Sequence, residues 1–77
     1  MQIRLFGIAK EIVGNDSLTV GEELQTVSQL KEWMNNQYPA MKSLSSFAVA
    51  VDHEYADDNQ PVSNNSEIAI IPPVSGG

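Results

Sequence analysis

Hydrophobic and polar residues alternate at the beginning of the chain, over residues 1–6. A period of two residues predicts a strand with one buried face, and Gly7 ends this strand. Residues 9–13 suffice for about one turn of helix, which Gly14 closes. Residues 17–20 alternate again and predict a second strand. Because only about ten residues separate the two strands, we expect them to form an antiparallel hairpin.

The next apolar residues recur at the spacing of an α-helix. Thr26 lies three residues before Gln29, which matches the capping box that begins many helices. The helix is expected to run from Val27 to Gln37 and to stop before Pro39, because proline disfavours a helical residue before it. Its apolar stripe needs a sheet to cover it. The stripe consists of Val27, Leu30, Trp33, Met34 and Tyr38.

Short apolar runs separated by polar turns follow in the second half of the chain. Residues 47–51 predict a strand, and residues 55–56 predict a short edge strand. Residues 57–66 are rich in Asn, Asp, Pro and Ser and predict a loop. Residues 67–71 are nearly all apolar, which is typical of a strand covered on both faces or paired centrally. The two prolines that follow end this strand, because proline has no N–H to donate.

The order of these elements predicts an α+β fold in a single domain. One main helix packs on a mixed sheet of about four or five strands, forming a roll in which the sheet grasps the helix. Parallel pairing of the first and last strands places the C-terminal end of the chain where the sheet ends. We therefore expect a folded domain over residues 1–71 and an extended tail over residues 72–77.

Composition and charge exclude several classes of function. The net charge is −6, and the basic residues Arg4, Lys10, Lys31 and Lys42 are scattered. Nucleic acids and anionic membranes attract clustered Lys and Arg, so we expect the chain to bind neither. No apolar run approaches the about 20 residues of a membrane span, and the N-terminus lacks a signal-peptide pattern, so we expect the cytoplasm. The chain has no cysteine, which excludes disulfides and thiolate chemistry.

The tail, Pro72-Pro73-Val74-Ser75-Gly76-Gly77, carries the candidate chemistry. Fully extended, it spans at most about 20 Å. The prolines hold its base extended, and the glycines leave its tip without side chains. Such a tail suits the delivery of a carboxylate through a narrow channel of another protein. An ionised carboxylate is a poor electrophile, so Gly77 must be activated, for example as an acyl-adenylate, before a sulfur nucleophile converts it to a thiocarboxylate.

Three stretches of the chain resemble one known family. Residues 5–14 are similar to that family's first strand and the basic-Glu-x-x-Gly turn after it. Residues 48–55 are similar to its middle strand and turn, and residues 67–77, the most specific stretch, to its last strand and Gly-Gly tail. The family is the small subunits of molybdopterin synthase, which are ubiquitin-like sulfur carriers. With the length and element order, the resemblance covers the whole chain.

The resemblance implies a β-grasp fold and a role in molybdenum cofactor biosynthesis. It implies that a ubiquitin-activating-like enzyme adenylates Gly77 with ATP and that a sulfur donor protein supplies the thiocarboxylate. It implies a heterotetramer of two small and two large subunits. Residues 72–76 then insert Gly77 into the large subunit, where sulfur passes to cyclic pyranopterin monophosphate. The chain binds no cofactor by itself, carries only covalent sulfur, and is not catalytic alone.

Two positions depart from the pattern of this family. Asp52 stands where many members have Asn, and either residue suits a turn. Ile70 and Ile71 replace a pair of aromatic residues, which keeps the apolar character of the strand and leaves its contact with a partner open.

Four further residues are candidates for a partner interface. Phe6 and Ile71, with Val74, are expected to form an apolar patch near the base of the tail, ringed by acidic residues, that docks onto a partner. Lys10 and Glu11 either touch that partner or are ordinary surface charges on a short helix.

No metal or catalytic site stands out elsewhere in the sequence. His53, the only histidine, lies between Asp52 and Glu54, and we favour a solvated turn over a metal site. Trp33 is expected in the core. We find no convincing Ser-His-Asp set or carboxylate pair.

Several alternatives to the molybdopterin carrier stay open. A Gly-Gly end alone is weak evidence, because chain termini without function are common. The sulfur carrier of thiamine thiazole synthesis shares the fold and the Gly-Gly end. The second alternative is a ubiquitin-like modifier that is joined through Gly77 to lysines of its targets. The third is a β-grasp binding module with an inert tail.

Overall fold

The computed structural model describes residues 1–43 and 47–72, and its strands form one mixed sheet. The strands are β1 (Gln2–Leu5), β2 (Ser17–Thr19), β3 (Ala48–Val51), β4 (Glu54–Tyr55) and β5 (Ile68–Ile71). Their order in the sheet is β2-β1-β5-β3-β4. β1 and β5 are parallel, and the other neighbours are antiparallel. The predicted hairpin and the predicted parallel pairing of the first and last strands are therefore both confirmed.

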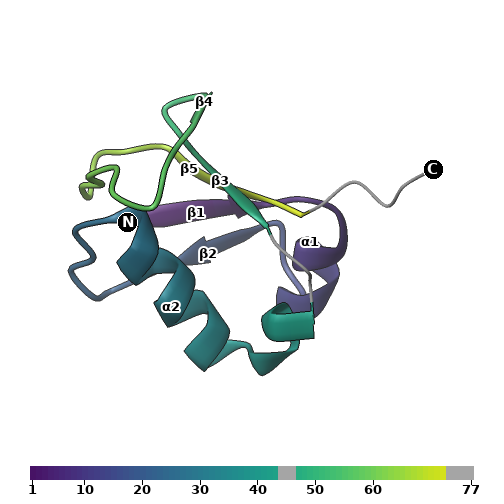
Figure 1. Cartoon of the computed structure of the whole chain (residues 1–77). Coiled ribbons are helices and arrows are strands. Elements are labelled where there is room, and N and C mark those ends of the chain that lie inside the picture. Colours follow the sequence, from purple (N-terminus) through teal and green to yellow (C-terminus); the bar gives the residue numbers. More distant parts are fainter. Residues whose placement is uncertain (44–46, 73–77) are drawn as a thin grey trace.

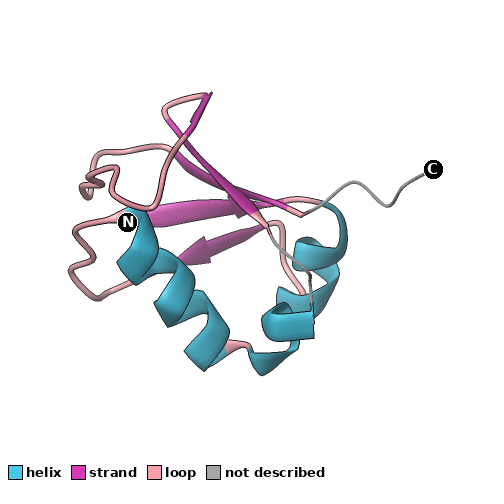
Figure 2. Ribbon diagram, in the orientation of Figure 1, coloured by secondary structure: helices cyan, strands magenta, loops and turns pink. Residues whose placement is uncertain are grey.

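Three helical segments lie on one side of this sheet (Figures 1 and 2). They are α1 (Gly7–Val13), α2 (Val27–Gln37) and the 3-10 helix η1 (Pro39–Ser43). α1 begins two residues earlier than predicted, because β1 already ends at Leu5 and Phe6 serves as the N-cap of the helix. Gly14 closes α1 as predicted, with a φ of 88° and its N–H donating to the Lys10 carbonyl at 2.8 Å. None of the helices in the described residues is long and apolar enough to cross a membrane.

The capping box at the start of α2 is present in a modified form. The Thr26 hydroxyl oxygen accepts a hydrogen bond from the Gln29 N–H at 3.3 Å, as the sequence predicts. The Gln29 side-chain oxygen accepts from the N–H of Gln25 at 2.9 Å, one residue before the position expected for a capping box. α2 has the bounds predicted for it.

The loop between β4 and β5 completes the start of α2. The Val27 N–H donates to the Gln60 carbonyl at 3.0 Å, and the Ser28 N–H donates to the Asp58 carbonyl at 2.9 Å. The Lys31 ammonium group lies 2.8 Å from the Asp58 carboxylate. Because the first N–H groups of a helix have no partner within it, these carbonyls satisfy donors that would otherwise depend on water. The same bonds hold the loop against the helix.

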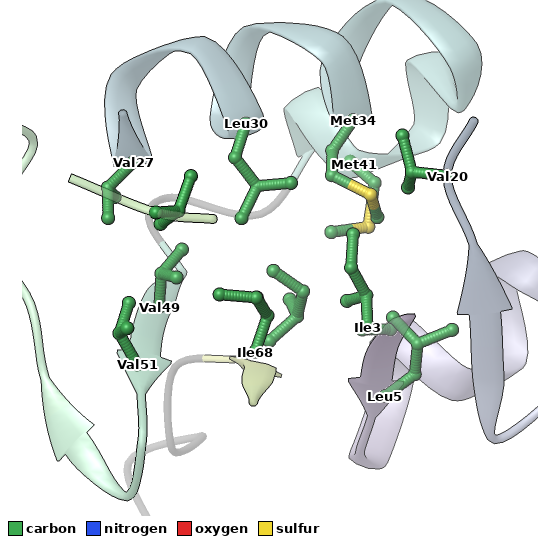
Figure 3. Close-up of a cluster of buried hydrophobic side chains, with 13 residues drawn as sticks. Ile3, Leu5, Val20, Val27, Leu30, Met34, Met41, Val49, Val51 and Ile68 are labelled. Carbon is green, nitrogen blue, oxygen red and sulfur yellow. The ribbon is translucent and has the colours of Figure 1, made fainter. Parts of the chain in front are cut away.

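Apolar side chains from α2 and from the sheet form the core. Val27, Leu30 and Met34 point from α2 towards the sheet, where Ile3 and Ile68 point back at them (Figure 3). These five residues are at most 1% exposed. No polar or charged residue within the described residues is buried. The hydrophobic contact between α2 and the sheet is thus the main source of stability.

The apolar stripe of α2 is narrower than predicted. Trp33 was predicted to lie in the core, but Trp33 and Tyr38 are only half-buried and pack against its margin. The indole N–H of Trp33 is buried without a hydrogen-bond partner.

β5 is the central strand of the sheet, as its apolar sequence predicts. Ile68 and Ile70 are at most 1% exposed and face the core. Ala69 and Ile71 are half-buried and line a hollow on the opposite face. Of the two alternatives for this strand, central pairing is confirmed, whereas cover on both faces is wrong for the described residues.

Replacing Leu30 by Ala tests the contact between α2 and the sheet. Leu30 is fully buried, so we expect the free energy of unfolding to fall by about 2 to 5 kcal/mol. Urea denaturation measures this change. The control is Asn36→Ala at an exposed position of α2, where a change below about 0.5 kcal/mol is expected. Equal losses for the two variants would contradict this account of the core.

Candidate functional site

The predicted carrier tail begins where the chain leaves the centre of the sheet. β5 lies between β1 and β3, and Pro72 follows directly after its last residue, Ile71. The predicted tail residues that lie outside the described residues are Pro73, Val74, Ser75, Gly76 and Gly77. The described part of the candidate site is therefore the root of the tail and the sheet surface around it.

Two of the predicted interface residues, Phe6 and Ile71, lie at the same end of the sheet. Leu5 pairs with Ile70 across the parallel strands. The residues that follow them, Phe6 and Ile71, therefore reach the same end of the sheet. Phe6 is 49% exposed, Ile71 is half-buried, and both line the same hollow. The structure thus brings these two apolar residues together beside Pro72.

Small residues in the middle of the sheet explain this hollow. On the face turned away from α2, Arg4, Ala69, Ala50 and Tyr55 form one row across four neighbouring strands. The two alanines lie between long side chains, so the surface dips over β5 and β3 into a hollow of about 320 Å³. We call this surface the open face. It comprises Arg4, Phe6, Ala50, Tyr55, Ala69 and Ile71.

A second hollow lies beside the first, over β1 and towards α1. It shares Arg4 and Phe6 with the first hollow, and Lys10 and Asp16 also line it. Glu11 is exposed and lines neither hollow. The structure therefore places Lys10, but not Glu11, at the border of the open face.

The charges around the open face are of both signs. Arg4 and Glu67 line both hollows, and Lys10 and Asp16 line the second one. The predicted ring of acidic residues is therefore wrong. Two of the four basic side chains of this acidic chain adjoin the surface on which the tail is rooted. A partner surface that also carries both charges fits it best.

The β3–β4 turn, which borders the open face, has an unusual backbone. Its residues Asp52 and His53 have φ values of 52° and 73°. The Asp52 N–H donates to the Glu67 carbonyl at 2.8 Å, and Asp52 Oδ1 accepts from the Glu67 N–H at 2.9 Å. His53 Nε2 lies 2.6 Å from Glu67 Oε2, although the His53 side chain is 84% exposed.

The side chains of this turn have different surroundings. His53 is a solvent-exposed turn residue, and Asp52 is engaged with the backbone of Glu67. Within the described residues, no group of three His, Asp or Glu side chains is arranged to hold a metal ion.

Several residues of the open face were not singled out by the sequence analysis. The alternation along β1 already places the side chain of Arg4 on the other face of the strand from Ile3, so the sequence could have predicted that Arg4 lies on this surface. The role of Ala50 and Ala69 was not visible, because it depends on the pairing of two strands that are distant in sequence. The contact of Gly7 with the root of the tail was missed for the same reason.

Known proteins are similar to this sequence over nearly its whole length. The model of the ThiS family matches residues 3–77. The molybdopterin synthase sulfur carrier subunit of Dictyostelium discoideum is 40% identical over 81 residues, covering 99% of this chain and 94% of that protein. The corresponding subunit of Escherichia coli (strain K12) is 25% identical over 80 residues, covering 100% of this chain and 99% of that protein.

Solved structures share the fold at lower sequence identity. The small archaeal modifier protein 1 of Methanosarcina acetivorans matches with a TM-score of 0.80 at 22% identity, covering 99% of this chain and 94% of that chain. A chain in the complex of subunits 1 and 2 of the molybdopterin-converting factor from Helicobacter pylori matches with a TM-score of 0.67 at 21% identity, covering 99% and 96%. At these identities the likeness shows the fold alone.

A mixed sheet with a parallel central pair, packed on one main helix, defines a β-grasp, ubiquitin-like domain. In such a domain the C-terminal residues follow directly from the central strand. The chain belongs to the ThiS family and, within it, to the sulfur carrier subunits of molybdopterin synthase, which serve molybdenum cofactor biosynthesis. The family, fold and carrier function predicted from the sequence are thereby confirmed.

The β3–β4 turn allows a test of its backbone geometry. We expect His53→Gly to raise the free energy of unfolding by about 0.5 to 1 kcal/mol, since glycine adopts a positive φ without the steric cost of a side chain. Asp52→Gly is the matched control: it relieves similar strain but loses the bond to the Glu67 N–H, so no gain is expected. Urea denaturation measures both. A less stable His53→Gly variant would show that the contact with Glu67 outweighs the strain.

Proposed function

We propose that Gly77 is the residue of this carrier that holds the sulfur. Its carboxylate attacks the α-phosphorus of ATP in an adenylating partner, which releases diphosphate and forms an acyl-adenylate. A sulfide equivalent from a donor protein then displaces AMP. One carboxylate oxygen leaves with the AMP and sulfur takes its place, which gives a thiocarboxylate. The observation that carries this proposal is the family match, which extends to residue 77 at the end of the tail.

The tail and the folded domain have separate tasks in this proposal. Residues 1–71 form the domain, and residues 72–77 form the tail that enters the partner. The prolines restrict the backbone at the base, while Gly76 and Gly77 present a tip without side chains. The chain is not a catalyst by itself, because activation of a carboxylate needs ATP and an enzyme that binds it.

The large subunit of molybdopterin synthase is the partner that receives the sulfur. The Helicobacter pylori structure is described as a complex of subunits 1 and 2 of the molybdopterin-converting factor, and we infer the same pairing here. We further propose a heterotetramer of two small and two large subunits, in which Gly77 donates sulfur to cyclic pyranopterin monophosphate. This chemistry belongs in the cytoplasm, where ATP and a reduced sulfur donor are available.

The open face is the surface that we expect to dock on the large subunit. Phe6 and Ile71 are apolar and adjacent, with Phe6 49% exposed and Ile71 half-buried, and the hollow over Ala50 and Ala69 has room for a side chain of the partner. An apolar centre with charges at its border is the usual composition of a protein interface. Lys10 supplies one such border charge. Glu11 stays the weakest of the proposed contacts, because it lines neither hollow.

Intact-mass spectrometry tests the role of Gly77. After incubation with the adenylating enzyme, ATP and a sulfur donor, the chain should gain about 16 Da, because one oxygen is replaced by sulfur. Deletion of Gly77 should abolish this gain and leave the melting temperature unchanged, since the core that the described residues form extends no further along the chain than Ile70. Omission of ATP is the second control.

The other outcomes distinguish the alternatives. A covalent adduct on a lysine of another protein would support a ubiquitin-like modifier. No change in mass, under conditions that load the Escherichia coli relative, would overturn the proposal. Addition of the large subunit and cyclic pyranopterin monophosphate to the loaded chain should return the mass to its original value. A loaded chain that supplies only thiazole synthesis would indicate the thiamine pathway.

Replacing Ile71 by Asp tests the open face as the docking surface. A buried, unpaired carboxylate in the interface should weaken binding to the large subunit by at least about tenfold in calorimetric titration. The matched control is Ile8→Asp, because Ile8 is 46% exposed and lines neither hollow. The affinity of the Ile8→Asp variant for the large subunit should stay near that of the wild type. Equal affinities for the two variants, with both chains folded, would place the docking surface elsewhere.

A further inference from the structure

The root of the tail touches the corner at which β1 turns into α1. β1 and β5 run parallel, with Leu5 opposite Ile70, so Gly7 and Pro72 are each the second residue beyond this pair. Figure 1 shows β5 ending beside the connection from β1 to α1. Residues from opposite ends of the chain therefore meet where the tail begins.

Gly7 fits this corner for two separate reasons. Its φ is +56°, in the left-handed region that side chains disfavour. A Cβ atom at this position would also lie only 3.0 Å from Cγ of Pro72, and 3.9 Å from its Cδ. Carbon atoms pack at about 3.5 to 4.0 Å, so a methyl group at Gly7 would displace the proline ring by a few tenths of an ångström. Glycine is thus favoured here both by its own backbone conformation and by its close approach to the residue at the root of the tail.

Gly14 provides an internal comparison. Its φ is +88°, which also lies in the left-handed region, yet a Cβ atom there would meet nothing within 4 Å. Both glycines relieve backbone strain at an end of the same short helix. Only Gly7 leaves room for Pro72. The contact with the tail is therefore a property of Gly7 beyond its backbone conformation.

The position of the root affects where the end of the tail is delivered. Five residues follow Pro72, and fully extended they reach at most about 16 Å. The residues that follow Pro72 are joined to it covalently, so their starting point moves whenever Pro72 moves. Reacting groups must be held to well within 1 Å, since a misplacement of about 1 Å can lower a rate by about a hundredfold. The seat of Pro72 is therefore a suitable point at which to control the direction of the tail.

We infer that Gly7 is a positioning residue for the tail. By leaving room for the Pro72 ring against the β1–α1 corner, it sets the direction in which residues 73–77 leave the sheet towards the active site of a partner. Gly7 touches neither the sulfur nor the activated carboxyl group, and it acts only through Pro72. This inference rests on the proposal that Gly77 carries the sulfur.

Thiocarboxylation kinetics test this inference, with the carrier as the varied substrate of the adenylating enzyme and intact mass as the readout. Gly7→Ala should lower kcat by between about tenfold and a hundredfold, because the tail enters at the wrong angle. KM should stay within about twofold, since the substitution adds only one methyl group and leaves the rest of the surface of the carrier unchanged. Gly14→Ala is the matched control, with a similar loss of stability and no change in kcat.

A double-mutant cycle separates the contact from the backbone strain. Pro72→Ala removes the Cγ atom that the new methyl group would strike, so the effect of Gly7→Ala on kcat should be smaller in the Pro72→Ala background than in the wild type. Equal effects in the two backgrounds would assign the loss to strain at Gly7 and overturn the inference. A nuclear Overhauser contact between the α protons of Gly7 and the γ protons of Pro72 is expected in the wild-type chain, and its absence would also overturn it.

The remaining outcomes separate the two proposals. If the wild type is loaded with sulfur and Gly7→Ala has the same kcat as Gly14→Ala, the positioning role is wrong and the carrier role of Gly77 stands. If the wild type gains no sulfur under conditions that load the Escherichia coli relative, both proposals fail, because there is no cargo to position. If Gly7→Ala does not fold, the wild-type Overhauser contact decides the inference.

Discussion

β5 is paired with β1 on one side and with β3 on the other, so the last strand of the described chain is also the middle strand of the sheet. Its pairing with β1 is parallel, and the two strands therefore end at the same edge of the sheet. This pairing places Ile68 and Ile70 beneath α2, and it brings Pro72 to the corner at which α1 begins. The core and the root of the tail both depend on it.

The alternation of side chains along the central strands gives the two faces of the sheet different tasks. In β5, Ile68 and Ile70 contribute to the core, whereas Ala69 and Ile71 contribute to the open face. Neighbouring β1 is divided in the same way. One face of the sheet thus makes the contacts that stabilise the fold, and the other face is available for contacts with a partner. In our proposal, recognition by the open face and chemistry on the tail are therefore separate functions of one chain.

Much of this molecule could be predicted from its sequence because the relevant signals are local. The spacing of Val27, Leu30 and Met34 predicted α2 with its correct bounds. The alternation over residues 1–6 and the apolar run over residues 67–71 predicted the two strands whose pairing orders the sheet. The Gly-Gly tail and the resemblance of three stretches predicted the family and the carrier function.

The tertiary structure alone decided which distant residues meet. Ala50 and Ala69 form the floor of a hollow because β3 and β5 pair in one register, and nothing in either segment specifies the other. The contact of Gly7 with Pro72, and the placing of Lys10 rather than Glu11 beside the open face, depend on the same packing. Periodicity and turn signals are properties of one segment, so the sequence by itself determined the elements and, through the family that it resembles, the carrier function. Contacts between segments depend on strand register and on the fit of a whole core, which exist only in the folded chain.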